Sequence, residues 1–134
     1  MKVTVDTNVL VRAVTEDDPA QAEIAKRILR EAEIAVLTVP VLCELVWVLS
    51  SRYKISAPDI GETIQALTDG SNVATDQQTV EAGLAMLAGG GDFADGVIAY
   101  EGEIRGADTF VSFDRKAVKL LQAQGHAALT LSRR

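Results

Sequence analysis

The sequence contains only one cysteine and one histidine among its 134 residues. Because Cys43 has no second thiol to pair with, an internal disulfide is excluded, and its neighbours Val41, Leu42 and Leu45 favour a buried apolar role. The histidine, His126, lies near the C-terminus. These two residues cannot build the usual zinc sites, and the chain shows no catalytic Ser–His pair and no phosphate-binding glycine loop.

Long apolar runs and positive charge are also scarce. The longest apolar stretch, 34–49, is interrupted by Pro40 and Glu44 and is shorter than the ~20 residues that span a bilayer. The N-terminus carries Asp6 and Asn8 where a signal peptide is apolar, so we expect a cytoplasmic protein with no membrane partner. The net charge of −6 argues against a general electrostatic binder of nucleic acids, although two bound divalent cations would bring it to about −2.

The composition is that of one globular domain covering residues 1–134, since 48% of the residues are hydrophobic and 24% charged. Short β-branched segments alternate with amphipathic ones. We expect strands at 2–6, 34–37, 72–74, 109–113 and 127–131, and helices at 7–16, 20–32, 40–52, 58–67, 76–87, 92–105 and 116–124. Strands separated by helical crossovers predict an α/β fold, a three-layer α/β/α sandwich with a mostly parallel sheet of roughly five strands.

Three carboxylates are candidate functional residues because of their positions, two at the ends of expected parallel strands and one within an apolar helix. Ligands bind beyond the C-terminal ends of parallel strands, and Asp6 and Asp114 follow the first and fourth expected strands. Glu44 lies in an apolar helical segment, where a carboxylate is costly unless it is paired or bound to a metal. A cation such as Arg52 or Arg105, or a helix N-terminus, would also satisfy it.

Two further aspartates, Asp92 and Asp95, lie one turn apart at the start of the helix that follows three glycines. Gly96 and Ala99 continue the same face with small side chains, which we expect to leave space beside Asp95. Asp92 can equally be only the N-cap of this helix, as can the aspartates that follow the first and fourth strands. Asp95 can be a first-turn acid that complements the helix dipole.

Each of these acids alone has a structural explanation, but the whole set indicates a metal site. Several carboxylates at one edge of a sheet repel one another by up to ~4 kcal/mol per close pair at an effective dielectric of 20, and a divalent cation relieves this repulsion. Because the available donors are oxygens, the sequence favours Mg²⁺ or Mn²⁺. Such ions activate water and stabilise the charge that develops in phosphodiester hydrolysis.

Four segments of the sequence, taken in order, resemble the PIN-domain family, in particular the VapC toxins of bacterial toxin–antitoxin pairs. They are Val5-Asp-Thr-Asn-Val-Leu10, the apolar helix around Glu44, Asp92-Phe-Ala-Asp-Gly-Val-Ile-Ala99 and Phe110-Val-Ser-Phe-Asp114. The resemblance implies that four acids are catalytic and bind the metal, namely Asp6, Glu44, Asp95 and Asp114. It implies supporting roles for Asp92, Thr7, Asn8 and Ser112. The chain departs from its relatives at Gly96 and Tyr100, where they usually read Ala-Leu-Ile-Ala-Ala.

The resemblance also implies an activity and partners. The activity is that of an Mg²⁺- or Mn²⁺-dependent endoribonuclease acting on structured RNA such as tRNA or rRNA, and the partners are a VapB-type antitoxin and a second copy of the chain. The apolar residues Trp47, Val48 and Tyr53 also favour a homodimer. Basic residues that can flank the acids and bind phosphates are Arg12, Lys26, Arg27, Arg52, Lys54, Arg115 and Lys116.

Two other functions are compatible with parts of the pattern. One is a PIN-like domain that binds a protein or RNA without catalysis, which the complete set of acids argues against. The other is a phosphatase with Asp6 as nucleophile. The haloacid-dehalogenase pattern places a second aspartate two residues further on, and here that position is Asn8.

Overall fold

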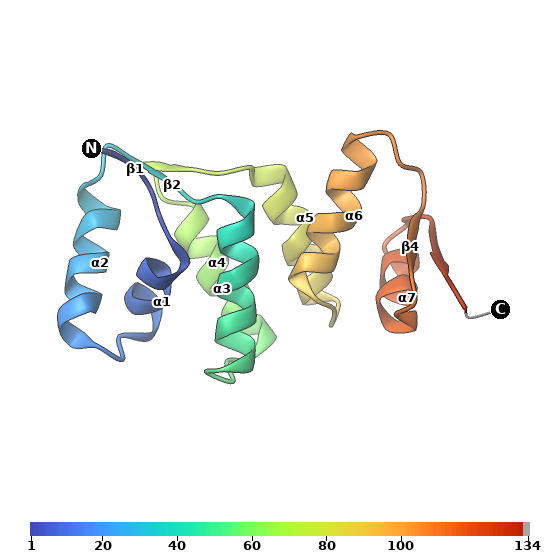
Figure 1. The fold of residues 1–134 in the computed structure, drawn as a ribbon, viewed down its shortest axis with the longest axis horizontal. Coiled ribbons are helices and arrows are strands. Elements are labelled where there is room, and N and C mark those ends of the chain that lie inside the picture. Colours follow the sequence, from blue (N-terminus) through green and yellow to red (C-terminus); the bar gives the residue numbers. More distant parts are fainter. Residues whose placement is uncertain (133–134) are drawn as a thin grey trace. The chain divides into compact units, whose positions relative to one another are not determined.

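Strands and helices alternate along the chain as the sequence pattern predicts (Figure 1). The structure is a computed structural model and describes residues 1–132, which form two compact units divided between Gln77 and Gln78. Unit 1, blue to yellow-green in Figure 1, contains β1 (Lys2–Thr4), α1 (Thr7–Thr15), α2 (Pro19–Glu31), β2 (Ile34–Val36), α3 (Val39–Ser51), α4 (Ala57–Thr68) and β3 (Val73–Ala74). Unit 2 contains α5 (Gln77–Ala88), whose first residue belongs to unit 1, and then α6 (Phe93–Ile104), β4 (Phe110–Ser112), α7 (Arg115–Ala123) and β5 (Ala128–Thr130).

Every strand pairing in the described part of the chain is parallel. Unit 1 has a three-stranded sheet in the order β1-β2-β3, with Lys2 opposite Ile34 and Ala35 opposite Val73. Unit 2 pairs β4 with β5, and Phe110 lies opposite Ala128. A helical crossover separates the strands of each pair, as parallel pairing requires. The predicted α/β class is therefore confirmed, and the five predicted strands are present in these two sheets.

The core of unit 1 is built from leucines and isoleucines on the inner faces of its helices and from Leu37, which follows β2. α1 packs against α2 and α3, and α3 packs against α4. The fully buried residues include Leu10, Leu37, Leu42, Leu45, Leu49, Ile60 and Ile64. Burying each such side chain contributes roughly 1.5–3 kcal/mol, so these residues fix how the four helices pack around the sheet.

One hydrogen-bonding residue ties the end of α2 to the sheet. The Asn72 side chain lies directly before β3, and its Nδ2 donates to the carbonyl oxygens of Leu29 and Ala32, each at 2.9 Å. These carbonyls stand at the C-terminal end of α2, where the helix itself supplies no donor. Asn72 therefore joins two elements that are 40 or more residues apart in sequence.

In unit 2, small residues bring α5 and α6 into close contact. A Cβ atom added at Gly96 would lie 2.5 Å from the carbonyl oxygen of Ala82 and 2.7 Å from Cβ of Met86. Gly83 faces the ring of the buried Phe93 in the same way. Ala99 is buried in a cluster with Met86, Ala117 and Leu121. The prediction that Gly96 and Ala99 leave open space beside Asp95 was wrong, because helix α5 and the core fill that side.

No helix within residues 1–132 is both long enough and apolar enough to cross a membrane.

Candidate functional site

Asp6 stands at the point where β1 gives way to α1. The strand ends at Thr4, the amide of Val5 still donates to the carbonyl of Val36 at 3.1 Å, and Asp6 is the N-cap of α1. Its carboxylate is exposed and accepts a hydrogen bond from the amide of Thr7 at 2.8 Å. The predicted position of Asp6 beyond the C-terminal end of a parallel strand is therefore confirmed.

Glu44 is exposed, which corrects the expectation of a carboxylate on an apolar face. The buried stripe of α3 consists of Leu42, Leu45, Val46 and Leu49. At 100° per residue, Glu44 lies about 200° around the helix from Leu42, on the opposite side. None of the ion pairs among residues 1–132 involves Glu44, so neither of the cations considered as its partner neutralises it. The buried residues have the i, i+3, i+4, i+7 spacing of one helix face, and Glu44 does not belong to this series, so its exposure could have been predicted from the sequence.

Asp6 and Glu44 line the same hollow on unit 1, which has a volume of about 500 Å³. We call it the Asp6–Glu44 hollow. Its other polar lining residues are Thr7, Asn8, Arg12, Asp17, Arg52 and Tyr53. The hollow therefore contains two of the four predicted metal-binding acids together with two cations, the chemical groups needed to hold a divalent ion and an anionic ligand.

In unit 2, Asp95 is half-buried in the first turn of α6 and lies within electrostatic reach of Asp92 and Asp114. Burial raises the pKa of the Asp95 carboxyl above its ordinary value, and the negative charges of Asp92 and Asp114 raise it further. We call these three residues the Asp95 cluster. Electrostatic repulsion within the cluster means that a bound cation would be favoured there.

Asp92 and Asp114 are also N-caps, as the sequence allowed. The Asp92 carboxylate accepts from the amide of Ala94 at 3.1 Å. The Asp114 carboxylate accepts from the amides of Lys116 and Ala117 at 3.0 and 3.2 Å, through the same oxygen, Oδ1. Capping through one oxygen leaves the second oxygen of the Asp114 carboxylate outside these hydrogen bonds. A capping role and a ligand role are therefore compatible at this position.

The predicted supporting residues lie next to the acids in both units. The Ser112 hydroxyl accepts from the amide of Asp114 at 3.0 Å and so orients the start of α7. The hydroxyl of Thr7 is buried and has no hydrogen-bond partner among the described residues. Asn8 is exposed and lines the Asp6–Glu44 hollow. The Thr7 hydroxyl, beside Asp6, is therefore shielded from solvent.

The residues present fit a hard divalent cation by their chemistry. Each of the four predicted ligands is a carboxylate, and the single histidine, His126, contacts Glu103 at 2.5 Å instead. Within residues 1–132, no three side chains of histidine, cysteine, aspartate or glutamate stand close enough together to hold a metal ion. The structure thus describes the four acids as a pair in each unit, and their convergence on one metal centre remains a prediction.

The basic residues differ in what they contact. Arg12 and Arg52 line the Asp6–Glu44 hollow. The guanidinium of Arg52 also lies 5.9 Å from the centre of the Trp47 ring, a cation–π distance. Lys26, by contrast, forms an ion pair with Glu16. These contacts could not be predicted from the sequence, because the positions of the cations depend on how the helices pack.

The order of strands and helices defines an α/β protein in which two of the predicted acids, Asp6 and Glu44, line one hollow. A comparison with protein families identifies a PIN domain over residues 3–121. Because this match covers most of the chain, the chain belongs to the PIN-domain family. The PIN domain is generally a metal-dependent nuclease fold that acts on nucleic acid. No curated protein matches the sequence at a significant level.

Proposed function

We propose that this protein is a metal-dependent endoribonuclease and the toxin of a VapBC-type toxin–antitoxin pair. The observation that carries the proposal is the family match over residues 3–121, which contains all four acids in the expected order. The geometry within each unit supports it. Asp6 and Glu44 share one hollow, and Asp95 lies close enough to Asp114 for its pKa to be raised.

The proposed metal ligands are Asp6 and Glu44 from unit 1 and Asp95 and Asp114 from unit 2, acting together in one PIN domain. Bound Mg²⁺ or Mn²⁺ would supply an activated water and would stabilise charge on the scissile phosphate. The protein's own part is to hold the carboxylates in place. The caps at Asp6 and Asp114 restrain these two side chains, and the Ser112 hydroxyl accepts from the amide of Asp114. Asp92, Thr7 and Asn8 are assigned supporting roles in this proposal.

RNA cleavage in the presence and absence of metal tests the activity. We expect the protein to cut tRNA or rRNA in Mg²⁺ or Mn²⁺ and to be inactive in EDTA. Asp6→Asn keeps the helix cap, since Asn caps well, but loses a ligand charge, so activity falls by at least about 100-fold. Asp59→Asn is the matched control, because Asp59 is also an exposed acid near a helix start but lies in α4.

Thermal melts separate a ligand from a cap at the same position. A metal that binds only the folded state stabilises it by RT ln(1 + [L]/Kd), so Mg²⁺ should raise the Tm of the parent more than that of Asp6→Asn. Equal cleavage by Asp6→Asn and the parent would contradict the metal role. Hydrolysis of a chromogenic phosphomonoester without RNA cleavage would instead identify a phosphatase, and RNA binding without cleavage a binding module.

The proposed partners are a VapB-type antitoxin and a second copy of the chain. Trp47 is 61% exposed on α3, while Val48 is half-buried and Tyr53 uses its hydroxyl within unit 1. An exposed tryptophan is the type of residue that dominates protein interfaces.

Light scattering at micromolar concentration should give the mass of a dimer, and a monomer would contradict this part of the proposal. Co-expression with the neighbouring reading frame should yield a complex in which RNA cleavage is inhibited.

A further inference from the structure

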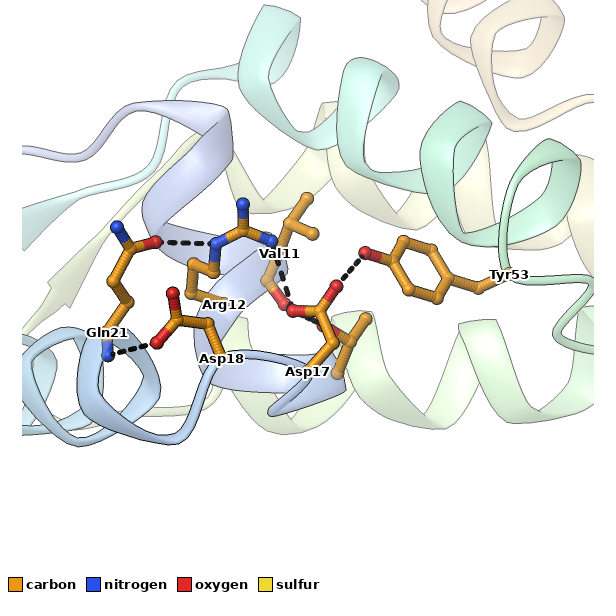
Figure 2. A network of polar contacts seen from close by, with 7 residues as sticks. Val11, Arg12, Asp17, Asp18, Gln21 and Tyr53 are labelled. Carbon is orange, nitrogen blue, oxygen red and sulfur yellow. Dashed lines mark hydrogen bonds and ion pairs between the residues drawn. The ribbon is translucent and has the colours of Figure 1, made fainter.

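Arg12 is the most tightly held cation in the Asp6–Glu44 hollow. Its Nε donates to Oε1 of Gln21 at 2.7 Å, and its Nη1 donates to Oδ1 of Asp17 at 3.0 Å. Figure 2 shows the guanidinium between these two partners. The backbone of Gln21 is held at the start of α2, because its backbone N–H donates to the N-cap residue Asp18 at 3.1 Å. The plane of the guanidinium is therefore set by groups on both sides.

The partner of Arg12 is fixed from a distant part of the sequence. The Tyr53 hydroxyl donates to Oδ2 of Asp17 at 2.6 Å (Figure 2). The Thr15 hydroxyl donates to Oδ1 of Asp17 at 3.1 Å. The hydrogen bond from Tyr53 is the main reason that the pKa of Asp17 is lowered. Asp17 therefore stays ionised and keeps its attraction for Arg12. We call Gln21, Asp17 and Tyr53 the Arg12 support.

Arg12 still has N–H donors that are not used by Gln21 or Asp17. A guanidinium carries five N–H groups, and the hydrogen bonds described above use two of them. The side chain is 35% exposed and lines the hollow that also contains Asp6 and Glu44. Within residues 1–132, Arg12 pairs with Asp17 and with neither of these two acids. Of the three carboxylates that line the hollow, Arg12 pairs with Asp17, so the hollow presents an oriented cation beside two carboxylates, Asp6 and Glu44, that it does not neutralise.

We propose that Arg12 binds a phosphate of the RNA substrate, and that the Arg12 support orients it for this purpose. The inference rests on the proposed ribonuclease function and adds a substrate-contacting residue to it. RNA presents phosphates on both sides of the bond that is cut, and arginine binds phosphate through two parallel N–H donors. Because the support holds the guanidinium before RNA arrives, less side-chain freedom is lost on binding.

A structural role for Arg12 is the competing explanation, since it links α1 to the beginning of α2. Both explanations predict a lower Tm for Arg12→Gln. Only the phosphate-binding role predicts weaker RNA binding with a smaller dependence on salt, because each phosphate contact releases counterions. Arg30→Gln is a matched control, because Arg30 is an exposed arginine in the last turn of α2 and does not line the hollow.

The experiment is single-turnover cleavage of a fluorescently labelled RNA in Mg²⁺ at increasing protein concentration and several salt concentrations. It yields the half-saturating concentration and the maximal rate separately. Arg12→Gln should raise the half-saturating concentration about tenfold and reduce its logarithmic salt slope by about 1. Arg12→Lys keeps the charge but not the planar fork, so it should keep the slope and still bind more weakly. Arg30→Gln should match the parent.

A double substitution tests the support. Tyr53→Phe removes only the hydroxyl that orients Asp17, so it should raise the half-saturating concentration in the parent. It should have no further effect in Arg12→Gln, because the group it positions is gone. Should Arg12→Gln fail to fold, the same comparison is made in Arg12→Lys.

The outcomes separate this inference from the proposed function. If the parent neither binds nor cuts RNA, the ribonuclease proposal fails. If the parent cuts RNA while Arg12→Gln has an unchanged half-saturating concentration and salt slope, with only a lower Tm, the phosphate role of Arg12 is overturned. Equal effects of Tyr53→Phe in the parent and in the Arg12 variant would overturn the positioning role.

Discussion

The carboxyl of Asp95 is in surroundings that disfavour its charge. Burial raises its pKa first, and the charges of Asp92 and Asp114 add to the effect. An acid whose pKa is higher in the folded protein than in the unfolded chain destabilises the fold when it is ionised. The penalty is absent below the unfolded pKa of about 3.9 and is complete above the folded pKa. Asp95 therefore becomes more unfavourable as the pH rises.

Replacing Asp95 by Asn removes this charge and keeps the shape of the side chain. In EDTA at pH 7 we expect Asp95→Asn to be more stable than the parent by up to about 1 kcal/mol, a limit set by solvent screening. The difference should shrink towards zero as the pH falls to about 4. Urea denaturation at both pH values measures it, with Asp59→Asn as control. A variant less stable than the parent at pH 7 would show that the helix dipole outweighs the repulsion.

The sequence predicted the positions of some site residues correctly, but it did not predict the exposure or the contacts of others. Asp6 and Asp114 were placed correctly because strand ends can be read from local patterns. The exposure of Glu44 was missed because its apolar neighbours in sequence lie on different sides of α3. The link between Arg12 and Tyr53 through Asp17 could not be predicted, since it depends on tertiary packing between residues far apart in the chain.

At the scale of elements, the ends of helices were the most predictable feature. Asp18 followed by Pro19 marks the start of α2, and the structure places the cap and the first helical residue there. Asp92 after three glycines marks the start of α6 in the same way. Such ends depend on side chains that bond to their own helix, so the local sequence is sufficient. Packing between helices is not local, which is why the role of Gly96 was misread.

The two glycines of α6 allow a matched test of helix packing. In Gly96→Ala the new Cβ would lie 2.5 Å from the Ala82 carbonyl oxygen, so the backbone must move, and we expect a loss of about 1–3 kcal/mol. In Gly102→Ala the nearest atom is Cβ of Ala107 at 3.8 Å, which is an ordinary contact. That variant should gain about 0.5–1 kcal/mol from higher helix propensity.

Chemical denaturation of both variants measures these two changes. The test is whether the two changes in the free energy of unfolding have opposite signs. Both variants replace glycine by alanine in α6, so a difference in sign must come from the surroundings of each residue. Stabilisation by both substitutions would show that α5 and α6 do not approach each other closely at Gly96.

At the scale of the whole molecule, the family match extends across both compact units. It covers residues 3–121, while the division falls between Gln77 and Gln78. The proposed metal centre likewise takes two acids from each unit. We therefore propose that the two units form one PIN domain, as the composition and length of the sequence predict.

Calorimetry tests this proposal through cooperativity. If residues 1–134 fold as one domain, heating should give a single transition whose calorimetric enthalpy equals the van't Hoff enthalpy. Two independent units would give a calorimetric enthalpy clearly larger than the van't Hoff value, or two separate transitions. Adding Mg²⁺ should move the single transition upward as a whole, because a ligand held by both units stabilises both.

The hydrogen bonds of the Asn72 side chain also affect how the protein folds while it is being synthesised. A ribosome releases the chain from its N-terminus, so α2 emerges well before the residue that caps its last carbonyls. While Asn72 is still inside the exit tunnel, the carbonyls of Leu29 and Ala32 must be satisfied by water. The arrival of residues 72–74 supplies both the amide donor and the third strand, so the first half of the molecule is completed by three consecutive residues late in its synthesis.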